Sequence, residues 1–244
     1  AAVILIGNEL LSGKVTDENG GYLIRELRAL GVLLQELRVV SDEIPAIAEA
    51  VQTLSERNDM VFTSGGVGPT HDDITLEGIA RAFGVEIVEN EGMAQHIGEV
   101  FRDDPERRSS FMKMAQVPMG TMLIQNAELF WPIYQVNNVY VLPGVPVIFR
   151  RQFDAIKSRF SSAPFVLKTI YVSIGEGQLA SMLTTACRMF PGIAFGSYPV
   201  WGEPDYRVRV TLESKDKNAV DAGYQWLCCE VGAEHIFKVV EGAL

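Results

Sequence analysis

The sequence predicts an α/β protein: a three-layer, mainly parallel sheet with helices on both faces, followed by a small two-layer βαββαβ lobe. Two observations carry this prediction. Short apolar runs alternate with amphipathic segments through residues 1–162, which is the pattern of right-handed strand-helix-strand crossovers. After "SSAP" the order becomes strand, helix, two strands, helix and strand. We therefore expect two domains, at residues 1–162 and 163–244.

Composition limits the classes of partner. The chain has 244 residues, 48% of them hydrophobic, with 21 basic and 31 acidic residues and a formal net charge of -10. This charge opposes binding to nucleic acid or to an anionic membrane surface. No apolar run approaches the roughly 20 residues of a membrane-spanning helix. The 3 cysteines show neither a disulfide framework nor zinc spacing, which favours a reducing cytoplasm.

Helical periodicity and end signals define the elements of the first domain. Leu23 and Leu27 share one face of a predicted helix, and Gly31 is its stop signal. The expected elements are a strand at Val3–Ile6, a helix at Asn19–Leu30, a strand within 32–40, a helix capped by Ser41 or Asp42 with Pro45 in its first turn, a strand at Met60–Thr63, a helix that begins near Asp73 or Thr75, and a helix from Pro146 to about Phe160.

The second domain alternates more simply. Its expected elements are a strand at Phe165–Ser173, a helix at Glu176–Met189, strands near Ile193–Tyr198 and Tyr206–Glu213, a helix at Asn218–Val231 and a strand near Ile236–Val239. This order is typical of a two-layer sandwich with both helices on one face of the sheet.

Two loops of the first domain are placed to bind a ligand, because ligands of parallel sheets lie beyond the carboxyl ends of the strands. They are Gly7–Asn19 and Ser64–Asp73. In the second loop, Gly65, Gly66 and Gly68 allow backbone N–H groups to approach a ligand, and a helix begins directly after them. Phosphate is the expected guest of such a loop.

Two acids follow these glycines and create an electrostatic conflict with a phosphate. Asp72 and Asp73 would repel the phosphate unless a divalent cation lies between them, and carboxylate oxygens are preferred ligands of Mg²⁺. The sequence therefore predicts a metal-phosphate site suited to pyrophosphate hydrolysis. A simpler interpretation remains open, in which the glycines serve a tight turn and Asp73 or Thr75 caps the helix. His71 is interpreted as a bystander more readily than as a catalytic group.

The first loop supplies complementary groups. Glu9 is a candidate general base or second metal ligand, Ser12 and Gly13 are candidate donors, and Lys14 is a candidate cation for developing negative charge. Asn19 is a candidate ligand-binding residue, although Asn19 and the nearby Asp17 also suit helix capping, and Lys14 also suits a solvated surface.

Four motifs in order resemble a known family. "GNELLSG", "TSGGVGPTHDDIT", "NVYVLPGVP" and "GSYP" are similar to the molybdopterin-binding-like (MogA-like) domain of CinA-type competence/damage-inducible proteins and of the N-terminal part of eukaryotic FAD synthase. The stretch "GSYPVWGEPDYRVRVTLES" resembles the FAD synthase branch. The resemblance spans nearly the whole chain.

The resemblance implies roles for individual residues. The phosphate site with its metal carries over to Ser64, Gly65, Gly66, Gly68, Thr70 and Asp73, and Asp72 matches the second acid of the CinA-like version. Asn8 stands at a metal-site position where many relatives have Asp, so it offers a neutral oxygen to the metal. The family's symmetric assemblies imply a homo-oligomer, either a dimer or a trimer.

We therefore expect a hydrolase: a pyrophosphatase dependent on a divalent metal (Mg, Mn or Co) that cleaves ADP-ribose, FAD or a similar dinucleotide. Asp73, Glu9 and Lys14 are its expected catalytic residues, and Lys113 is an alternative cation. One alternative is a module that binds a pterin or nucleotide without turnover. Another is a molybdenum-cofactor biosynthesis protein, which complementation of a cofactor-deficient strain tests.

Overall fold

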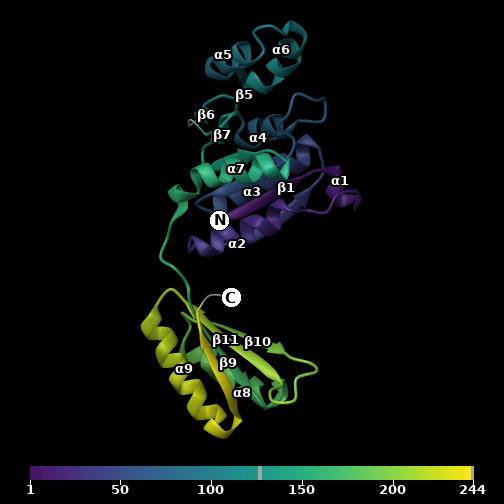
Figure 1. Cartoon of the computed structure of the whole chain (residues 1–244). Coiled ribbons are helices and arrows are strands. Elements are labelled where there is room, and N and C mark those ends of the chain that lie inside the picture. The colour runs from purple at the N-terminus through teal and green to yellow at the C-terminus, as the bar shows by residue number, and fades with distance from the viewer. Residues whose placement is uncertain (126–127, 243–244) are drawn as a thin grey trace. The chain divides into compact units, whose positions relative to one another are not determined.

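The computed structural model describes residues 1–125 and 128–242, and the chain divides into two compact units, Ala1–Ser162 and Ala163–Leu244 (Figure 1). Residues 126, 127, 243 and 244, which the predicted domains include, lie outside the described residues. Within the described part of the chain, no helix is long and apolar enough to cross a membrane.

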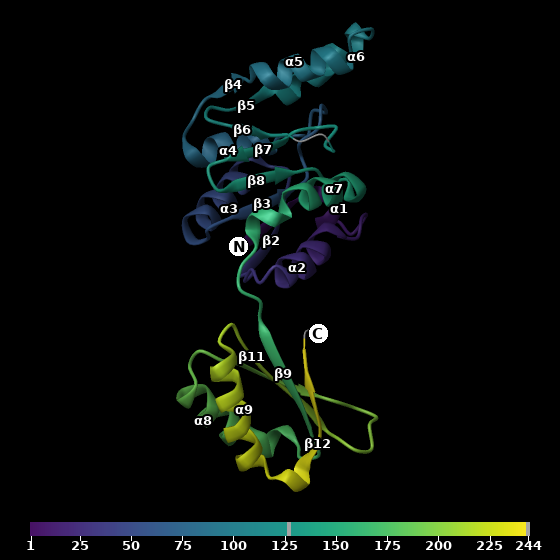
Figure 2. The same cartoon turned by 60° about the vertical axis from the view of Figure 1, so that its left-hand side comes forward.

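The first unit contains a six-stranded sheet with the order β2-β1-β3-β8-β7-β6 (Figure 2). Its strands are β1 (Ala2–Ile6), β2 (Glu36–Val40), β3 (Val61–Ser64), β6 (Met122–Ile124), β7 (Ile133–Val136) and β8 (Val139–Leu142). The first four strands in the sheet order are parallel, and β7 and β6 continue the sheet in antiparallel pairing. The predicted fold class, with a mainly parallel sheet, is confirmed.

Helices and short elements complete this unit. They are α1 (Asn8–Leu11), α2 (Asn19–Ala29), α3 (Ile44–Arg57), α4 (Thr75–Phe83), α5 (Glu91–Val100), α6 (Pro105–Phe111), α7 (Pro146–Ile156), the 3-10 helices η1 (Met112–Ala115) and η2 (Lys157–Phe160), and a two-stranded sheet of β4 (Ile87–Glu89) and β5 (Gln116–Pro118). The predicted helix from Pro146 to Phe160 is thus an α-helix with a final 3-10 turn.

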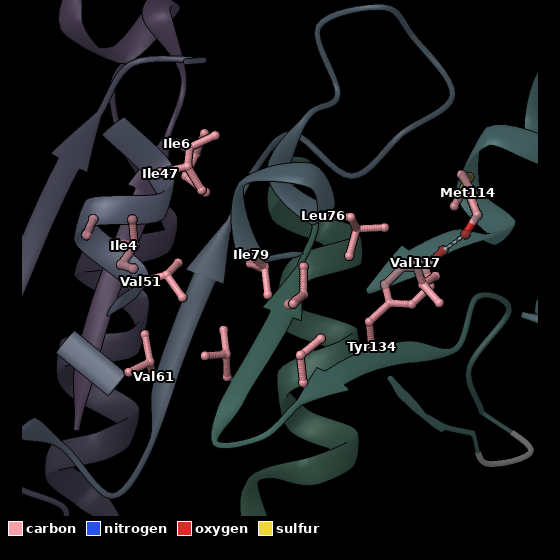
Figure 3. Close-up of a cluster of buried hydrophobic side chains, with 14 of the residues drawn as sticks. Ile4, Ile6, Ile47, Val51, Val61, Leu76, Ile79, Met114, Val117 and Tyr134 are labelled. Carbon is pink, nitrogen blue, oxygen red and sulfur yellow. Dashed lines mark hydrogen bonds between the residues drawn. The ribbon is translucent and has the colours of Figure 1, made fainter. Parts of the chain in front are cut away.

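Strand β1 contributes to two separate cores because successive side chains of a strand point to opposite faces. Ile4 and Ile6 pack with residues of α3 and α4, such as Ile47 and Ile79 (Figure 3). Val3 and Leu5 pack with residues of α2 and α7, which include Leu23, Leu27, Phe149 and Phe153. Helices therefore cover both faces of the sheet, which leaves the ends of the strands as the accessible part.

The predicted cap of α3 by Ser41 or Asp42 is wrong. The N-cap residue is Glu43, without a side-chain cap, and Pro45 lies in the first turn as expected. The Asp42 carboxylate instead accepts a hydrogen bond of 2.7 Å from the backbone N–H of Asn8. This long-range contact explains the difference, because it uses the carboxylate that a local cap would need.

The second unit is a βαββαβ sandwich, as predicted. Its elements are β9 (Val166–Val172), α8 (Glu176–Met189), β10 (Ala194–Pro199), β11 (Val208–Ser214), α9 (Lys217–Val231), the 3-10 helix η3 (Ala233–His235) and β12 (Ile236–Glu241). The strands pair antiparallel in the order β10-β11-β9-β12. One face of this sheet packs on α8 and α9 through residues such as Ile170, Val210 and Leu227.

Candidate functional site

The candidate site lies where three parallel strands of the first unit end. The N–H of Gly65, directly after β3, donates to the carbonyl of Leu142 at the end of β8, at 3.1 Å. A Cβ atom on Gly144, after β8, would lie 3.4 Å from the Cα of Gly65. The loops after β1, β3 and β8 therefore approach each other at the carboxyl edge of the sheet, where ligands of such sheets bind.

The glycine loop needs its glycines for backbone reasons. Gly65 and Gly66 have φ angles of 108° and 65°, which favour glycine. A Cβ on Gly65 would lie 2.2 Å from the carbonyl oxygen of Ile6. The loop is fixed to the start of α4, because the hydroxyl of Thr75 donates to the Gly65 carbonyl at 2.8 Å and its N–H to the Gly66 carbonyl at 3.0 Å. The glycines thus do serve a tight turn.

The same turn leaves three consecutive N–H groups unused. Among the described residues, the backbone N–H groups of Gly66, Val67 and Gly68 have no hydrogen-bond acceptor, and these residues line a cavity. Successive N–H groups in a concave loop form an anion-binding nest. The turn and the phosphate interpretations are therefore compatible.

Thr70 holds the two acids together. Its N–H donates to Asp73 Oδ2 at 2.8 Å, and its hydroxyl lies 2.6 Å from both Asp73 Oδ2 and Asp72 Oδ1. The hydrogen bond from Thr70 is the main cause that lowers the pKa of Asp72 below its ordinary value. The amine of Lys113 donates to the Thr70 carbonyl, and the His71 side chain is 96% exposed with Nδ1 3.8 Å from Asp72. Asp72 is therefore ionised at neutral pH.

The first loop is split by the short helix α1. Glu9 faces Gly7, since a Cβ there would lie 2.5 Å from Glu9 Oε1, and Glu9 lines the cavity. Ser12, Gly13 and Lys14 lie in the exposed turn after α1 and do not line it. Asn8 is exposed, and its N–H is directed to the end of β2 through Asp42.

Asn19 connects the ends of two strands. Its side-chain amide donates to the Ser64 hydroxyl at 2.9 Å and to the Gly144 carbonyl at 2.8 Å. The carboxylate of Asp17 caps α2 by accepting from the N–H groups of Asn19 and Gly20. Ser64 and Asn19 are both buried, so they stabilise the loops through hydrogen bonds and do not face the ligand.

The cavity has a volume of about 480 Å³ and joins the predicted residues to an apolar end. Of the predicted residues, Glu9, Gly65, Gly66, Gly68 and Asp73 line it. Asn8, Ser12, Gly13, Lys14, Asn19, Ser64, Thr70 and Asp72 do not. The lining residues that sequence reasoning missed include Phe111, Met114, Trp131, Tyr134, Ile148 and Gln152.

Aromatic side chains form the apolar end of the cavity. The rings of Phe111 and Trp131 are stacked, with centroids 5.6 Å apart and planes inclined by 10°. The hydroxyl of Tyr134 donates to the Met114 carbonyl at 2.8 Å (Figure 3), and burial raises the pKa of this phenol. Tyr134 therefore remains neutral, and this end of the cavity suits a planar, uncharged ring.

The acidic pair fits a divalent cation as a partial ligand set. No group of three or more His, Cys, Asp or Glu side chains arranged for a metal occurs among the described residues. Mg²⁺, however, is usually bound by one or two carboxylates together with substrate phosphates and water. Asp73 lines the cavity with those N–H groups, and the Thr70 hydroxyl holds Asp72 beside it, so the two acids would supply the carboxylates if a phosphate occupied the N–H groups.

Comparisons with known proteins identify relatives that align with most of the chain. A probable FAD synthase of Caenorhabditis briggsae is 32% identical over 91% of this chain and 47% of its own length. A protein of Archaeoglobus fulgidus is 33% identical over 89% of this chain and 92% of its own. The chain therefore spans about half the length of the FAD synthase relative.

The comparisons with solved structures and with family models agree with the resemblance read from the motifs. The crystal structure of the CinA protein of Thermoplasma acidophilum, described as having unknown function, matches 65% of this chain and 96% of its own at 30% identity with a TM-score of 0.58. Residues 164–240 match the middle domain of FAD synthase. Residues 2–162 match the probable molybdopterin binding domain, and the chain belongs to this family.

Proposed function

We propose that the first unit binds the phosphates of a dinucleotide such as ADP-ribose or FAD and hydrolyses the P–O–P link with a divalent cation. One observation carries the proposal. The unused N–H groups of Gly66, Val67 and Gly68, the carboxyl group of Asp73 and the aromatic end belong to one cavity. A phosphorylated planar ring is the ligand whose chemistry fits both ends.

Each group of residues would have a separate role in binding or hydrolysis. The N–H groups of the glycine loop would bind the phosphate oxygens, and Asp72 and Asp73 would hold the cation against them. When bound, such a cation neutralises phosphoryl charge and lowers the pKa of a water molecule. Glu9, which lines the same cavity, would accept a proton from the attacking water. Water adds to phosphorus, the P–O bond breaks, and AMP leaves with ribose 5-phosphate or FMN.

The names of the relatives support the choice of substrate. The second unit matches a domain of FAD synthase, and a probable FAD synthase aligns over 91% of the chain. FAD contains a pyrophosphate link and planar rings, so it offers phosphates for the glycine loop and a ring for the aromatic end. ADP-ribose offers the same link with one ring, so the two substrates separate the contribution of the flavin.

The test is release of AMP from FAD and ADP-ribose, followed by chromatography, with Mg²⁺, Mn²⁺, Co²⁺ or a chelator. We expect metal-dependent release, and a loss of about a hundredfold or more in Asp73→Asn. Glu56→Gln is the matched control, because it removes an exposed carboxylate on α3. Full activity in a folded Asp73→Asn protein would contradict the proposal.

A second function is favoured by specific observations. Lys14 does not line the cavity, Asn8 presents a neutral side chain, and the described residues contain no group of three metal-ligand side chains. These features suit a module that binds a nucleotide or pterin without turnover. Calorimetric binding of FAD, with no AMP formed under any of the three metals, would identify this function.

A further inference from the structure

Lys113 does not line the cavity, although the sequence makes it an alternative cation for the negative charge of the ligand. It lies on η1, and its amine donates to the backbone carbonyl of Thr70, 43 residues earlier in the chain. The residue is half-buried. The charged end of Lys113 is therefore engaged in the loop that carries the two acids rather than at the place of a phosphate.

Thr70 is the residue through which Lys113 is connected to both acids. The N–H and the hydroxyl of Thr70 contact Asp73, and the same hydroxyl contacts Asp72. The carbonyl of Thr70 accepts from Lys113 and also from the N–H of Asp73, at 3.3 Å. All three polar groups of Thr70 are thus engaged, so a displacement of its carbonyl disturbs the contacts to both acids.

The loop of the two acids is exposed and carries like charges. Thr70, His71 and Asp72 are exposed, so burial in the core does not fix their side chains. A hydroxyl has one proton and donates to one carboxylate at a time, while the two carboxylates repel each other. The bond from Lys113 supplies this loop with a fixed contact to another element and with a positive charge.

We infer that Lys113 is a positioning residue: it fixes the Thr70 carbonyl and so holds Asp72 and Asp73 in the arrangement that receives the divalent cation. The inference rests on the cation-binding half of the proposed function, not on hydrolysis. A lysine that acted through its charge alone would repel a cation. A positioning lysine favours cation binding, because it lowers the entropic cost of arranging the two carboxylates.

The two roles predict opposite changes in cation affinity for Lys113→Met. Loss of a positive charge alone would tighten Mn²⁺ binding, whereas loss of the positioned acids weakens it, by about fivefold. Electron paramagnetic resonance of free Mn²⁺ measures the affinity, with the metal alone and with AMP, which has a phosphate but no P–O–P link. Arg81→Met removes an exposed charge in the last turn of α4 and is the matched control, with wild-type affinity expected.

A metal-free measurement follows the hydrogen bond from the Thr70 N–H to Asp73. In chelator, amide hydrogen exchange of this N–H should become about fivefold faster in Lys113→Met and remain unchanged in Arg81→Met. Unchanged exchange in Lys113→Met overturns the inference, and so does Mn²⁺ binding that is as tight as in the wild type or tighter. Thermal melting verifies folding, and Lys113→Gln repeats both measurements if the methionine variant does not fold.

A double variant tests whether Lys113 acts through Thr70. Thr70→Val removes the hydroxyl that contacts both acids. Lys113→Met should therefore weaken Mn²⁺ binding less in the Thr70→Val background than in the wild type, because residues that act in one chain of contacts are not additive. Equal losses in the two backgrounds contradict the inference.

These results are distinguishable from the fate of the hydrolysis proposal. Weaker Mn²⁺ binding in Lys113→Met, together with no AMP release from FAD or ADP-ribose in the wild type, supports the positioning role and rejects the pyrophosphatase. Metal-dependent AMP release together with unchanged Mn²⁺ affinity in Lys113→Met does the reverse. A wild-type protein that does not bind Mn²⁺ overturns the inference together with the proposed cation site.

Discussion

The two units of the chain protect their sheets by different means. In the first unit, helices cover both faces, so β1 has no side chain left for solvent: Val3 and Leu5 belong to one core, and Ile4 and Ile6 to the other. In the second unit, helices cover one face through Ile170 and its neighbours. The first sheet is thus accessible at its edge, which is where the candidate site lies.

The second sheet covers its helix-free face with side chains. On this face, the amine of Lys238 lies 4.3 Å from the centroid of Tyr171, and the guanidinium of Arg209 lies 4.7 Å from that of Tyr198. Thr169 and Thr211, which alternation places on the same face, are 4% and 6% exposed. Cations over aromatic rings therefore shield this face. The comparison teaches that the parallel sheet is covered by helices on both faces, whereas the antiparallel sheet is covered by helices on one face and by long side chains on the other.

Truncation of one aromatic residue in each sheet gives the largest expected contrast. Phe62 is fully buried and contacts the rings of Tyr140, Phe153 and Phe160. Phe62→Ala should destabilise the first unit by about 3–5 kcal/mol, because it opens a cavity in a closed core. Tyr171→Ala should destabilise the second unit by about 1–2 kcal/mol, since Tyr171 itself is only partly buried.

Amide hydrogen exchange on the full chain measures these losses separately in β3 and β9. Wild-type exchange in the unit that was not mutated is the internal control. Equal losses of stability in the two units would show that the helix-free face of the second sheet is packed as tightly as the core of the first unit.

The next contrast concerns glycines that precede helices. In Gly65→Ala, the new Cβ would lie 2.2 Å from a backbone carbonyl oxygen at a φ of 108°, so we expect destabilisation of about 2–3 kcal/mol. In Gly175→Ala, nothing lies within 4 Å of the Cβ and φ is -84°, so thermal stability should remain almost unchanged. Similar melting temperatures for the two variants would show that the glycine loop is not a close backbone contact.

The smallest effect is expected at the ion-pair cluster of Lys168, Asp221 and Glu241 in the second unit. Lys168 Nζ lies 2.8 Å from Asp221 and 2.7 Å from Glu241, and the Lys168 hydrogen bond is the main cause that lowers the pKa of Asp221. A lowered pKa in the folded state stabilises the protein above the unfolded value of about 3.9, and this contribution is lost as pH falls through the folded value.

Lys168→Met should therefore flatten the acid loss of stability of the second unit below about pH 4. Lys217→Met, which removes the more exposed partner of Asp221, is the control with a weaker expected effect. Urea unfolding across this pH range, followed by NMR signals of the second unit, measures the slope. An unaltered slope in Lys168→Met would show that this ion-pair cluster does not contribute to the pH dependence of unfolding.

Local signals were enough to predict much of the fold. Short apolar runs located β1 and β3, and helical periodicity with Gly31 located α2, because these patterns depend on residues close in sequence. The cap of α3 could not be predicted, since the partner of Asp42 is the N–H of Asn8, which only the pairing of β1 with β2 brings near. The four-residue helix α1 is too short to show a period.

The site divides in the same way. The glycines and acids of the β3 loop form a compact sequence motif, so Gly65, Gly66 and Asp73 could be named as cavity residues in advance. Gln152, which also lines the cavity, had no such signal: its amide is oriented by the carbonyl of Trp131, 21 residues away, which only the fold brings near. A single sequence shows which residues are present but not which distant residues meet around one cavity.

Asn19 has a consequence for how the site opens. Its amide joins the first turn of α2 to Ser64 and to Gly144, so the loops after β3 and β8 have one common fastening. We therefore expect the two loops to open together more often than separately, and a ligand that orders one of them to lower the entropic cost of ordering the other. Entry and exit of a ligand would then be governed by a single opening rate rather than by the independent motions of separate loops.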